Sequence, residues 1–392
     1  MTARLPYNPR ILAGPHEPCV AAEVARLVGP RPPTGGWVVA LSGLNVRQGA
    51  ELRRVAAACG GEAWLAPKGD GLTDAVAELP AAGLDAAIER LAATGGQAAP
   101  LAEALGATAA AWRRQAWTLR CGARALDVGR RTLVMGVVNV TPDSFSDGGR
   151  FLDTAAAIEQ GRRLAEAGAD ILDIGGESTR PGAPSVGAEA ECRRVVPVIE
   201  ALAAEVGVPI SIDTSKAEVA RRALDAGATM LNDVTALRGE PAMARLAAEA
   251  AVPVAVMHMK GTPRTMQKDP RYDDLMGEIV AWLRASIAMA VDAGVAAEQV
   301  VVDPGIGFGK TVAHNLEILR RLPELRSLGR PILLGTSRKS FIGATLGTPV
   351  GERLLGTAAT VAFGIERGAH IVRVHDVAEM RQVARMTDAM RG

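Results

Sequence analysis

The sequence predicts an α/β protein that consists of a TIM (β/α)8 barrel preceded by a small N-terminal α/β domain of ferredoxin-like type. Eight strand-like apolar runs alternate with amphipathic stretches of helical length from about residue 117 onwards. Eight β-α units within about 260 residues match the size and repeat of a TIM barrel. The runs are almost continuously apolar, which suits parallel strands buried on both faces. The expected boundaries are residues 1–115 for the N-terminal extension and 116–392 for the barrel.

The N-terminal extension begins with an irregular, proline-rich segment over residues 1–36. The elements expected after it are strands at 37–43, 62–67 and 75–81 and helices at 47–59 and 84–93. This β-α-β-β-α order is typical of a ferredoxin-like unit. The extension holds no cluster of convergent polar groups, so we interpret it as a structural or assembly domain.

The barrel pattern opens with a predicted hairpin over residues 117–129. The eight strands are expected at residues 132–138, 169–175, 208–213, 229–234, 252–259, 299–305, 330–335 and 370–374. Ser215 and Glu218 have the spacing of a capping box, which predicts a helix start directly after the third strand. An open doubly wound sheet is the alternative architecture, but no dinucleotide-binding turn accompanies the strands.

Composition argues against several classes of function. The chain has 392 residues, of which 48% are hydrophobic and 22% are charged, and its formal net charge is +1. The chain therefore has no strong overall positive charge that would attract nucleic acid or an anionic membrane. No apolar run is long enough to span a bilayer. The N-terminus lacks the apolar core of a secretion signal. The four cysteines form no C-x-x-C pair, which argues against a disulfide framework or a zinc site and favours a reduced, cytoplasmic setting.

Polar residues stand at the carboxyl ends of the predicted strands, where the catalytic groups of such barrels lie. Asp213, Asn232 and Asp303 would project into the barrel mouth as a set of carboxylate and amide groups. This set suits a flat heterocycle with adjacent N–H donors, because one carboxylate can accept two such hydrogen bonds. Helix capping is the alternative role for any single aspartate.

Basic residues accompany the last two strands, across the mouth from the carboxylates. Arg338 and Lys339 follow the seventh strand, while Arg373 and His375 alternate along the eighth and would point to the same face. Barrels often place a phosphate site here, so this group predicts a site for phosphate or pyrophosphate. A solvated loop is the alternative for Arg338 and Lys339, and Lys339 could instead form a Schiff base.

Three loops complete the predicted rim. The segments TPDSFSDGG (141–149) and GGESTRPGA (175–183) are long and rich in small residues, as mobile lids are, although ordinary surface turns share this composition. The segment DPGIGFGKT (303–311) is not a nucleotide-binding P-loop, because Pro304 stands at the position of the first glycine and has no N–H group. We expect Lys310 to start the next helix or to face solvent.

These motifs together resemble those of dihydropteroate synthases. The resemblance covers about residues 117–392 and consists of MGVVNVTPDSFSDGG, DIGGESTRPGA, SIDTSK, NDV, MHMKGTPRTMQ, DPGIGFGK, GTSRKSFIG and RVHDV, in the order of that family. It implies a transferase that condenses 6-hydroxymethyl-7,8-dihydropterin pyrophosphate with 4-aminobenzoate. The products would be 7,8-dihydropteroate and pyrophosphate, in the step of folate synthesis that sulfonamides block.

The resemblance also implies roles for the matching residues. The pterin would be bound by Asp213, Asn232, Asp303 and Lys339, with Met257 nearby. The pyrophosphate site would consist of Asn139, Arg373 and His375, with Asn139 helping to hold Mg²⁺. The aminobenzoate pocket would consist of Phe145, Thr179, Arg180, Pro181, Phe308 and Ser340. The catalytic residues would be Lys339, Arg373, His375 and Asp213.

The expected partners are the two small-molecule substrates, Mg²⁺ and a second copy of the chain in a homodimer. An arylamine is already nucleophilic, so no strong general base is required, and we expect no Ser–His or Cys–His machinery. One alternative is a methyltetrahydrofolate:corrinoid methyltransferase, which would not need the two long loops or the basic group. Another is a pterin-binding paralogue without activity, which would lack some of these residues. The resemblance assigns no role to residues 1–115.

Overall fold

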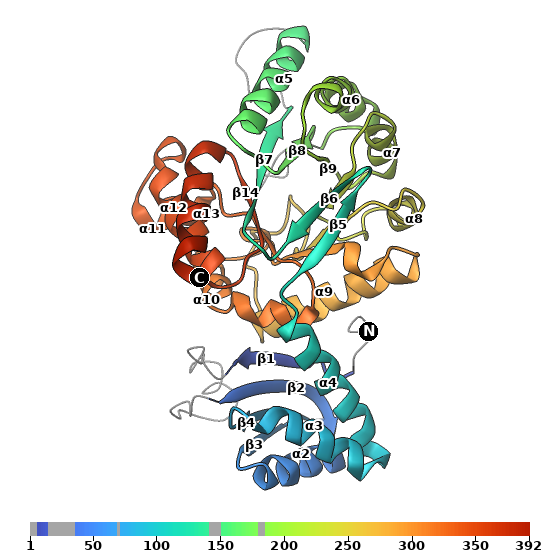
Figure 1. Ribbon diagram of the computed structural model, residues 1–392, viewed down its shortest axis with the longest axis vertical. Coiled ribbons are helices and arrows are strands. Elements are labelled where there is room, and N and C mark those ends of the chain that lie inside the picture. Colours follow the sequence, from blue (N-terminus) through green and yellow to red (C-terminus); the bar gives the residue numbers. More distant parts are fainter. Residues whose placement is uncertain (1–5, 15–35, 69–70, 141–149, 179–184) are drawn as a thin grey trace. The chain divides into compact units, whose positions relative to one another are not determined.

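The computed structural model describes residues 6–14, 36–68, 71–140, 150–178 and 185–392, with residues 150–153 described by their backbone alone. The chain divides into two compact units. The first contains residues 1–115 together with the segments 276–285 and 321–329, and the second contains the rest of the chain. Each unit has its own sheet and its own hydrophobic core (Figure 1).

The first unit contains a four-stranded antiparallel sheet in the order β1-β2-β4-β3. Its strands are β1 (Arg10–Ala13), β2 (Trp37–Asn45), β3 (Glu62–Pro67) and β4 (Leu72–Leu79). Its helices are α2 (Val46–Ala58), α3 (Gly83–Thr94) and α4 (Ala99–Arg113), with the short η2 (Gly96–Ala98) between the last two. Buried apolar residues of strands and helices form one core, so the helices cover one face of the sheet.

The predicted β-α-β-β-α order of this unit is confirmed, but the expectation that residues 1–36 are irregular was wrong at β1. This strand pairs antiparallel with β2 at the edge of the sheet. It therefore takes the edge position that the last strand of a ferredoxin-like unit occupies, although it comes first in the chain. The sequence gives little indication of β1, because it has only four residues next to a proline and a strand this short depends on pairing with its neighbour.

The second unit is the predicted barrel. Its strands are β7 (Leu133–Asn139), β8 (Ile171–Gly175), β9 (Ile210–Asp213), β10 (Met230–Asp233), β11 (Val254–Met257), β12 (Val300–Asp303), β13 (Leu333–Leu334) and β14 (Ile371–Val374). Neighbours are parallel, in the order β12-β11-β10-β9-β8-β7-β14-β13. A parallel bridge between Val302 and Ile332 joins the two ends of this order and closes the barrel.

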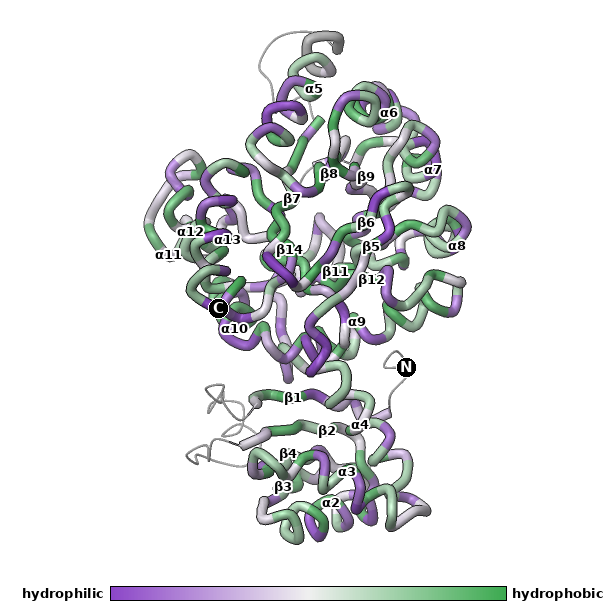
Figure 2. Tube along the Cα trace, viewed as in Figure 1, coloured by the Kyte–Doolittle hydropathy of each residue, from purple (hydrophilic) through white to green (hydrophobic). Residues whose placement is uncertain are grey.

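Helices follow the strands and lie outside the sheet (Figure 1). They are α5 (Arg150–Glu166), α6 (Ala188–Glu205), α7 (Ala217–Asp225), α8 (Pro241–Glu249), α9 (Leu275–Asp292), α10 (Val312–Arg320), α11 (Ser340–Leu346), α12 (Leu354–Glu366) and α13 (Val377–Arg391), with the short η4 (Ala297–Gln299) and η6 (Val350–Glu352). Residues 276–285 of α9 and the short η5 (Leu322–Leu328) belong to the first unit. Figure 2 shows mixed hydrophobic and hydrophilic residues along α6 and α7, as expected for helices with one buried face. Within the described ranges, no helix is long and apolar enough to cross a membrane.

The predicted hairpin covers the amino end of the barrel. It consists of β5 (Trp117–Cys121) and β6 (Arg124–Val128), which pair antiparallel. Its apolar side chains share a buried core with Leu133, Ile171 and Ile371, which lie at the starts of barrel strands. A substrate site therefore has room at the opposite, carboxyl end of the strands.

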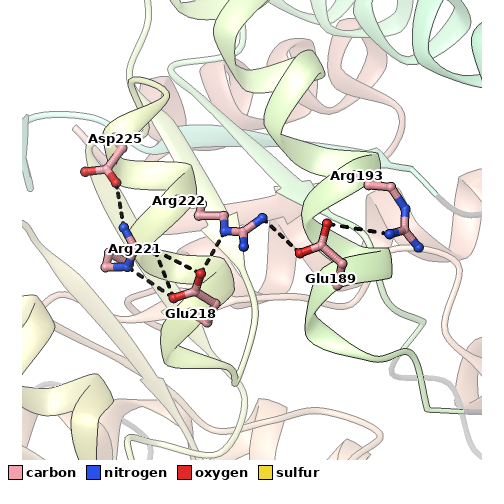
Figure 3. A network of polar contacts seen from close by, with 6 residues as sticks. All are labelled: Glu189, Arg193, Glu218, Arg221, Arg222 and Asp225. Carbon is pink, nitrogen blue, oxygen red and sulfur yellow. Dashed lines mark hydrogen bonds and ion pairs between the residues drawn. The ribbon is translucent and has the colours of Figure 1, made fainter.

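Helix α7 does not use the capping box predicted from Ser215 and Glu218. Its N-cap is Lys216, which makes no side-chain cap, and Glu240 accepts the N–H of the first helical residue at 2.9 Å. Glu218 instead joins a surface network made of Glu189, Arg193, Glu218, Arg221, Arg222 and Asp225 (Figure 3). Exposed ion pairs contribute at most about 1 kcal/mol each, so this network is a solvated face that links α6 to α7.

Candidate active site

Polar side chains gather at the carboxyl end of the barrel. Asp213 and Asp303 are the last residues of β9 and β12, Asn232 is the third residue of β10, and Arg373 is the third residue of β14. In the closed barrel only β13 separates β12, which carries Asp303, from β14, which carries Arg373, and each of these two residues influences the ionisation of the other. The carboxylates and the guanidinium therefore share one end of the barrel.

The acidic and basic groups are interleaved, which corrects the expectation that they face each other across the mouth. Arg373 donates Nε to Oδ2 of Asp173 and Nη2 to Oδ2 of Asp213, each at 2.6 Å. Asn232 donates Nδ2 to the same Oδ2 of Asp173 at 3.0 Å. Asp173 and Asn232 are buried, and Asp213 and Arg373 are half-buried. One network thus combines two carboxylates, an amide and a cation.

Asp213 is held close to its neutral form. Burial raises the pKa of Asp213 to about 7, against the opposing effect of Arg373. The charges of Asp173, Glu191 and Asp233 raise the pKa further. The carboxylate, which is the form that accepts N–H donors, is therefore the main species only above about neutral pH.

Asp303 and Lys339 form a second pair of opposite charges. Asp303 accepts the N–H of Gly305 at 2.6 Å, and burial raises its pKa while Lys339 opposes this shift. Burial lowers the pKa of Lys339 to about 8, while Asp303 favours its charged form. Lys339 donates to the carbonyl of Ile306, and its Nζ lies 4.8 Å from the centroid of the Phe308 ring. A carboxylate, a cation and an aromatic ring are thereby placed side by side.

His375, just beyond β14, is oriented by a serine. Nδ1 of His375 lies 2.9 Å from Oγ of Ser337, which also accepts the backbone N–H of His375 at 3.2 Å. A serine hydroxyl can donate or accept a second hydrogen bond, so this contact fits either neutral tautomer of the imidazole. This contact with Ser337 orients the His375 ring.

The other candidate residues are placed as follows. Arg338 does not join the basic group, because it forms an exposed ion pair with Asp376. Asn139 ends β7 and is half-buried, Met257 ends β11 in a small apolar cluster, and Ser340 is an exposed residue at the start of α11. Outside the described residues lie Phe145, Thr179, Arg180 and Pro181.

Lys310 is buried, so the expectation that it starts a helix or faces solvent was wrong. Its side chain is 3% exposed, and α10 begins two residues later at Val312. Its Nζ lies 2.9 Å from Nδ1 of His258 and donates to the carbonyls of His258 and Phe308 at 3.3 and 2.9 Å. These contacts tie the end of β11 to the glycine loop that follows β12.

Two further groups at this end of the barrel were missed by sequence reasoning. Asp173 interrupts an apolar strand, and a lone charge in such a run was the available signal. Lys216 binds both Glu177 and the buried Glu191, and Glu177 accepts the N–H of Val186 at 2.9 Å. Glu177 lies near the start of the predicted rim loop 175–183 and Val186 lies just beyond its end, and nothing in the sequence shows that Lys216 binds Glu177.

Comparisons with known proteins identify the family of this chain. A family model for "Pterin binding enzyme" matches residues 135–375. The dihydropteroate synthase of Synechocystis sp. is 50% identical over 273 residues, which cover 69% of this chain and 94% of that protein. A Xanthomonas albilineans dihydropteroate synthase solved with 4-aminobenzoic acid is 46% identical, with a TM-score of 0.67 over 71% of this chain and 99% of that one. A Yersinia pestis dihydropteroate synthase solved in a sulfonamide drug complex is 44% identical, with a TM-score of 0.67 over 70% of this chain and 99% of that one. The chain therefore belongs to the dihydropteroate synthase family of pterin binding enzymes.

Proposed function

We propose that this chain joins 6-hydroxymethyl-7,8-dihydropterin pyrophosphate to 4-aminobenzoate at the carboxyl end of its barrel. Membership of the family makes it a transferase of folate biosynthesis, with 7,8-dihydropteroate and pyrophosphate as products. The observation that best supports this location is the network in which Arg373 is shared between Asp173 and Asp213.

The pterin ring is assigned to Asp213, Asn232 and Asp303. A pterin presents adjacent ring and exocyclic N–H groups, and a carboxylate can accept two of them in a bidentate pair. Each charged hydrogen bond of this kind contributes about 1.5–3 kcal/mol. Met257 supplies apolar contact beside these polar groups, and Lys339 balances the charge of Asp303.

The pyrophosphate is assigned to Asn139, Arg373 and His375. The guanidinium and the imidazole of His375 would stabilise negative charge on the departing oxygens. Mg²⁺ usually binds one or two protein oxygens together with substrate phosphates and water, and the amide oxygen of Asn139 fits this role. In the part of the chain that the structure describes, no three His, Cys, Asp or Glu side chains form a metal cluster, so the substrate would supply the main ligands. When bound, Mg²⁺ would neutralise part of the leaving-group charge.

The aminobenzoate is assigned to Phe308 and Ser340, together with Phe145, Thr179, Arg180 and Pro181. The ring of Phe308 offers an aromatic face directly beside the Lys339 ammonium. The arylamine would therefore approach next to the pterin site. A sulfonamide would compete for the same pocket, in line with the drug complex of the Yersinia pestis relative.

The reaction breaks the C–O bond between the pterin methylene and pyrophosphate and forms a C–N bond to the arylamine. The C–O electron pair leaves with pyrophosphate, and the electron-rich dihydropterin ring stabilises positive charge on the methylene. The amine lone pair forms the new bond, and the amine proton passes to water or to pyrophosphate. Positioning and electrostatic stabilisation then supply the acceleration, without a strong general base.

A homodimer is proposed from apolar side chains exposed on α11, α12 and α13, which pack against one another in sequence order. These side chains are Leu346, Leu354, Leu355, Phe363, Met386 and Met390. Large exposed apolar areas mark interaction sites in folded proteins. A second copy of the chain is the partner expected for them.

The remaining partners are proposed to be small molecules in a cytoplasmic setting. A net charge of +1 gives no general attraction for nucleic acid. Three cysteines in the described ranges, Cys59, Cys121 and Cys192, are free thiols, which supports a reducing compartment.

The test mixes the purified chain with both substrates and Mg²⁺ and measures pyrophosphate and 7,8-dihydropteroate. Equal amounts of both products are expected, and EDTA is expected to suppress them. A synthase of known activity serves as the control for intact substrates. Product formation by that control and none by this chain would contradict the proposal.

A further inference from the structure

Asp173 lies at the centre of the site network but has no part in the assignments above. It is the third residue of β8, is 0% exposed and is surrounded in the strand by apolar residues. Its Oδ2 accepts hydrogen bonds from both Arg373 and Asn232. Its Oδ1 has no hydrogen-bond partner among the residues that the structure describes. A buried carboxylate with an unpaired oxygen costs folding free energy, so stability does not explain this residue.

The two carboxylates that hold Arg373 differ in exposure and in the atom that they bind. The side chain of Asp173 is 0% exposed and binds Nε, which is the guanidinium nitrogen nearest to the backbone. The side chain of Asp213 is 13% exposed and binds Nη2 at the tip. A ligand entering from the barrel mouth therefore reaches Asp213 and leaves the contact with Asp173 intact.

We propose that Asp173 is a positioning residue, which anchors Arg373 and Asn232 while the pterin substrate takes the place of Arg373 on Asp213. In the free protein the guanidinium hydrogen-bonds to both aspartates. When ring N–H groups bind Asp213, Nη2 is released toward the leaving group, and the bond from Nε to Asp173 keeps the guanidinium in place. This inference rests on the proposed function, because it needs a ligand with N–H donors and an anionic leaving group.

Asp173 also sets the orientation of Asn232. An ionised carboxylate only accepts hydrogen bonds, so the NH2 end of the Asn232 amide must face Asp173. The carbonyl oxygen of the amide then points away from Asp173 and can accept an N–H group of the ring. One buried carboxylate thereby orients a donor for the leaving group and an acceptor for the pterin.

The test compares Asp173→Asn with Asp233→Asn. Asp233 is a matched control, because it is also 0% exposed but accepts the backbone N–H groups of Thr235 and Leu237 instead of a site residue. In Asp173→Asn, kcat/KM for the pterin pyrophosphate should fall about 100-fold, as expected for a displaced catalytic group. KM for aminobenzoate should change by less than about threefold, because neither anchored residue faces that substrate.

A pH profile separates positioning from a purely structural role. Asp173 raises the pKa of Asp213 more than Glu191 and Asp233 do, whereas Arg373 lowers it. Removing the charge of Asp173 should therefore move the rise of kcat/KM with pH, attributed to ionisation of Asp213, to lower pH. Asp233→Asn should move this rise by a smaller amount.

Equal decreases in kcat/KM for both substrates would overturn the proposal. Equal decreases in kcat/KM in Asp173→Asn and Asp233→Asn would overturn it too. Unchanged kcat/KM for the pterin pyrophosphate in folded Asp173→Asn would overturn it as well. If Asp173→Asn does not fold, Asp173→Ser, which is smaller and uncharged, replaces it.

Calorimetry with 6-hydroxymethyl-7,8-dihydropterin pyrophosphate alone separates this inference from the proposed function. Wild-type protein that binds this probe but forms no dihydropteroate would contradict only the function. Weaker binding by Asp173→Asn than by Asp233→Asn would still support the anchoring role, and equal binding would overturn it.

Discussion

Nζ of Lys310 lies 2.9 Å from Nδ1 of His258, and both side chains are buried. The same ammonium group donates to the carbonyls of His258 and Phe308. Burial is the main cause that lowers the pKa of each group, and the charge of Lys310 lowers that of His258 further. This contact fastens the loop that carries Phe308 to the end of β11, so it helps to hold the candidate active site in place.

Replacing Lys310 by methionine removes this contact and leaves two carbonyl oxygens and a ring nitrogen without their donor. We expect the free energy of unfolding to fall by about 3 kcal/mol or more, since each of the three buried acceptors left unpaired costs about 1–3 kcal/mol. Urea unfolding measures the change. Lys268→Met, at an exposed position, should cost less than about 0.5 kcal/mol. Equal decreases in the free energy of unfolding of Lys310→Met and Lys268→Met would show that Lys310 does not fasten the loop.

The contribution of His258 to stability should decrease in acid, while Asp213, whose pKa is raised, contributes in the opposite direction as pH falls through about 7. Burial lowers the pKa of His258 in the folded protein to about 2, whereas the unfolded chain protonates this ring below about pH 6.5. At this ring the unfolded state therefore binds more protons in this window, and the contribution of His258 to the free energy of unfolding falls as pH decreases from about 6.5 toward 2. The loss approaches about 1.4 kcal/mol per pH unit for one group.

Urea unfolding at about pH 7 and about pH 5 checks this expectation. His258→Gln removes the titrating ring, so the free energy of unfolding of the wild type should fall relative to that of the variant as pH decreases from about 7 to about 5. The same slope in both proteins would mean that another group causes the loss.

The barrel could be predicted because its strands are apolar runs separated by helical stretches. The site could be predicted only in part, because the sequence shows which residues end the strands but not which side chains meet. Lys310 looks like a solvated residue after a glycine, and its partner His258 lies 52 residues earlier. Asp173 is visible as a charge in an apolar run, but its bond to Arg373 spans 200 residues. The edge strand β1 is missed for the same reason, since its stability comes from pairing with β2.

Lys216 should influence the affinity for aminobenzoate without touching it. Through Glu177 and Glu191 it fastens the ends of a loop whose sequence includes the proposed pocket residues Thr179, Arg180 and Pro181. We expect Lys216→Met to raise KM for aminobenzoate about tenfold, with a smaller effect on the pterin substrate. Steady-state kinetics with each substrate varied in turn measures this.

Two variants control for this prediction. Lys216→Arg keeps the charge and should restore most of the affinity, while Arg221→Met in the surface network of Figure 3 should leave both KM values unchanged. A KM for aminobenzoate that stays at the wild-type value in Lys216→Met would contradict the link between this ion pair and the pocket.

Leu355 should be central to the proposed homodimer. It is 81% exposed on α12, which packs against α11 and α13, and these helices also carry exposed apolar side chains. Leu355→Glu places a charge that would be buried at the interface, and we expect it to convert dimers to single chains in sedimentation experiments. Val291→Glu changes an exposed valine on α9 and should leave the sedimenting mass equal to that of the wild-type dimer. A wild type that sediments as a single chain would contradict the dimer itself.

Lys339 should be required for turnover but not for folding. Its ammonium group lies beside Asp303 and the ring of Phe308, so Lys339→Ala should lower kcat/KM about 100-fold while the folded structure is retained. The pH dependence is the sharper measurement. Because burial lowers the pKa of Lys339 to about 8, the charged form is lost as pH rises through that value, and kcat/KM should fall on the alkaline side. Lys339→Arg stays charged to above pH about 12, so its residual activity should lack this fall. An alkaline fall near pH 8 that persists in Lys339→Arg would assign the titration to another group.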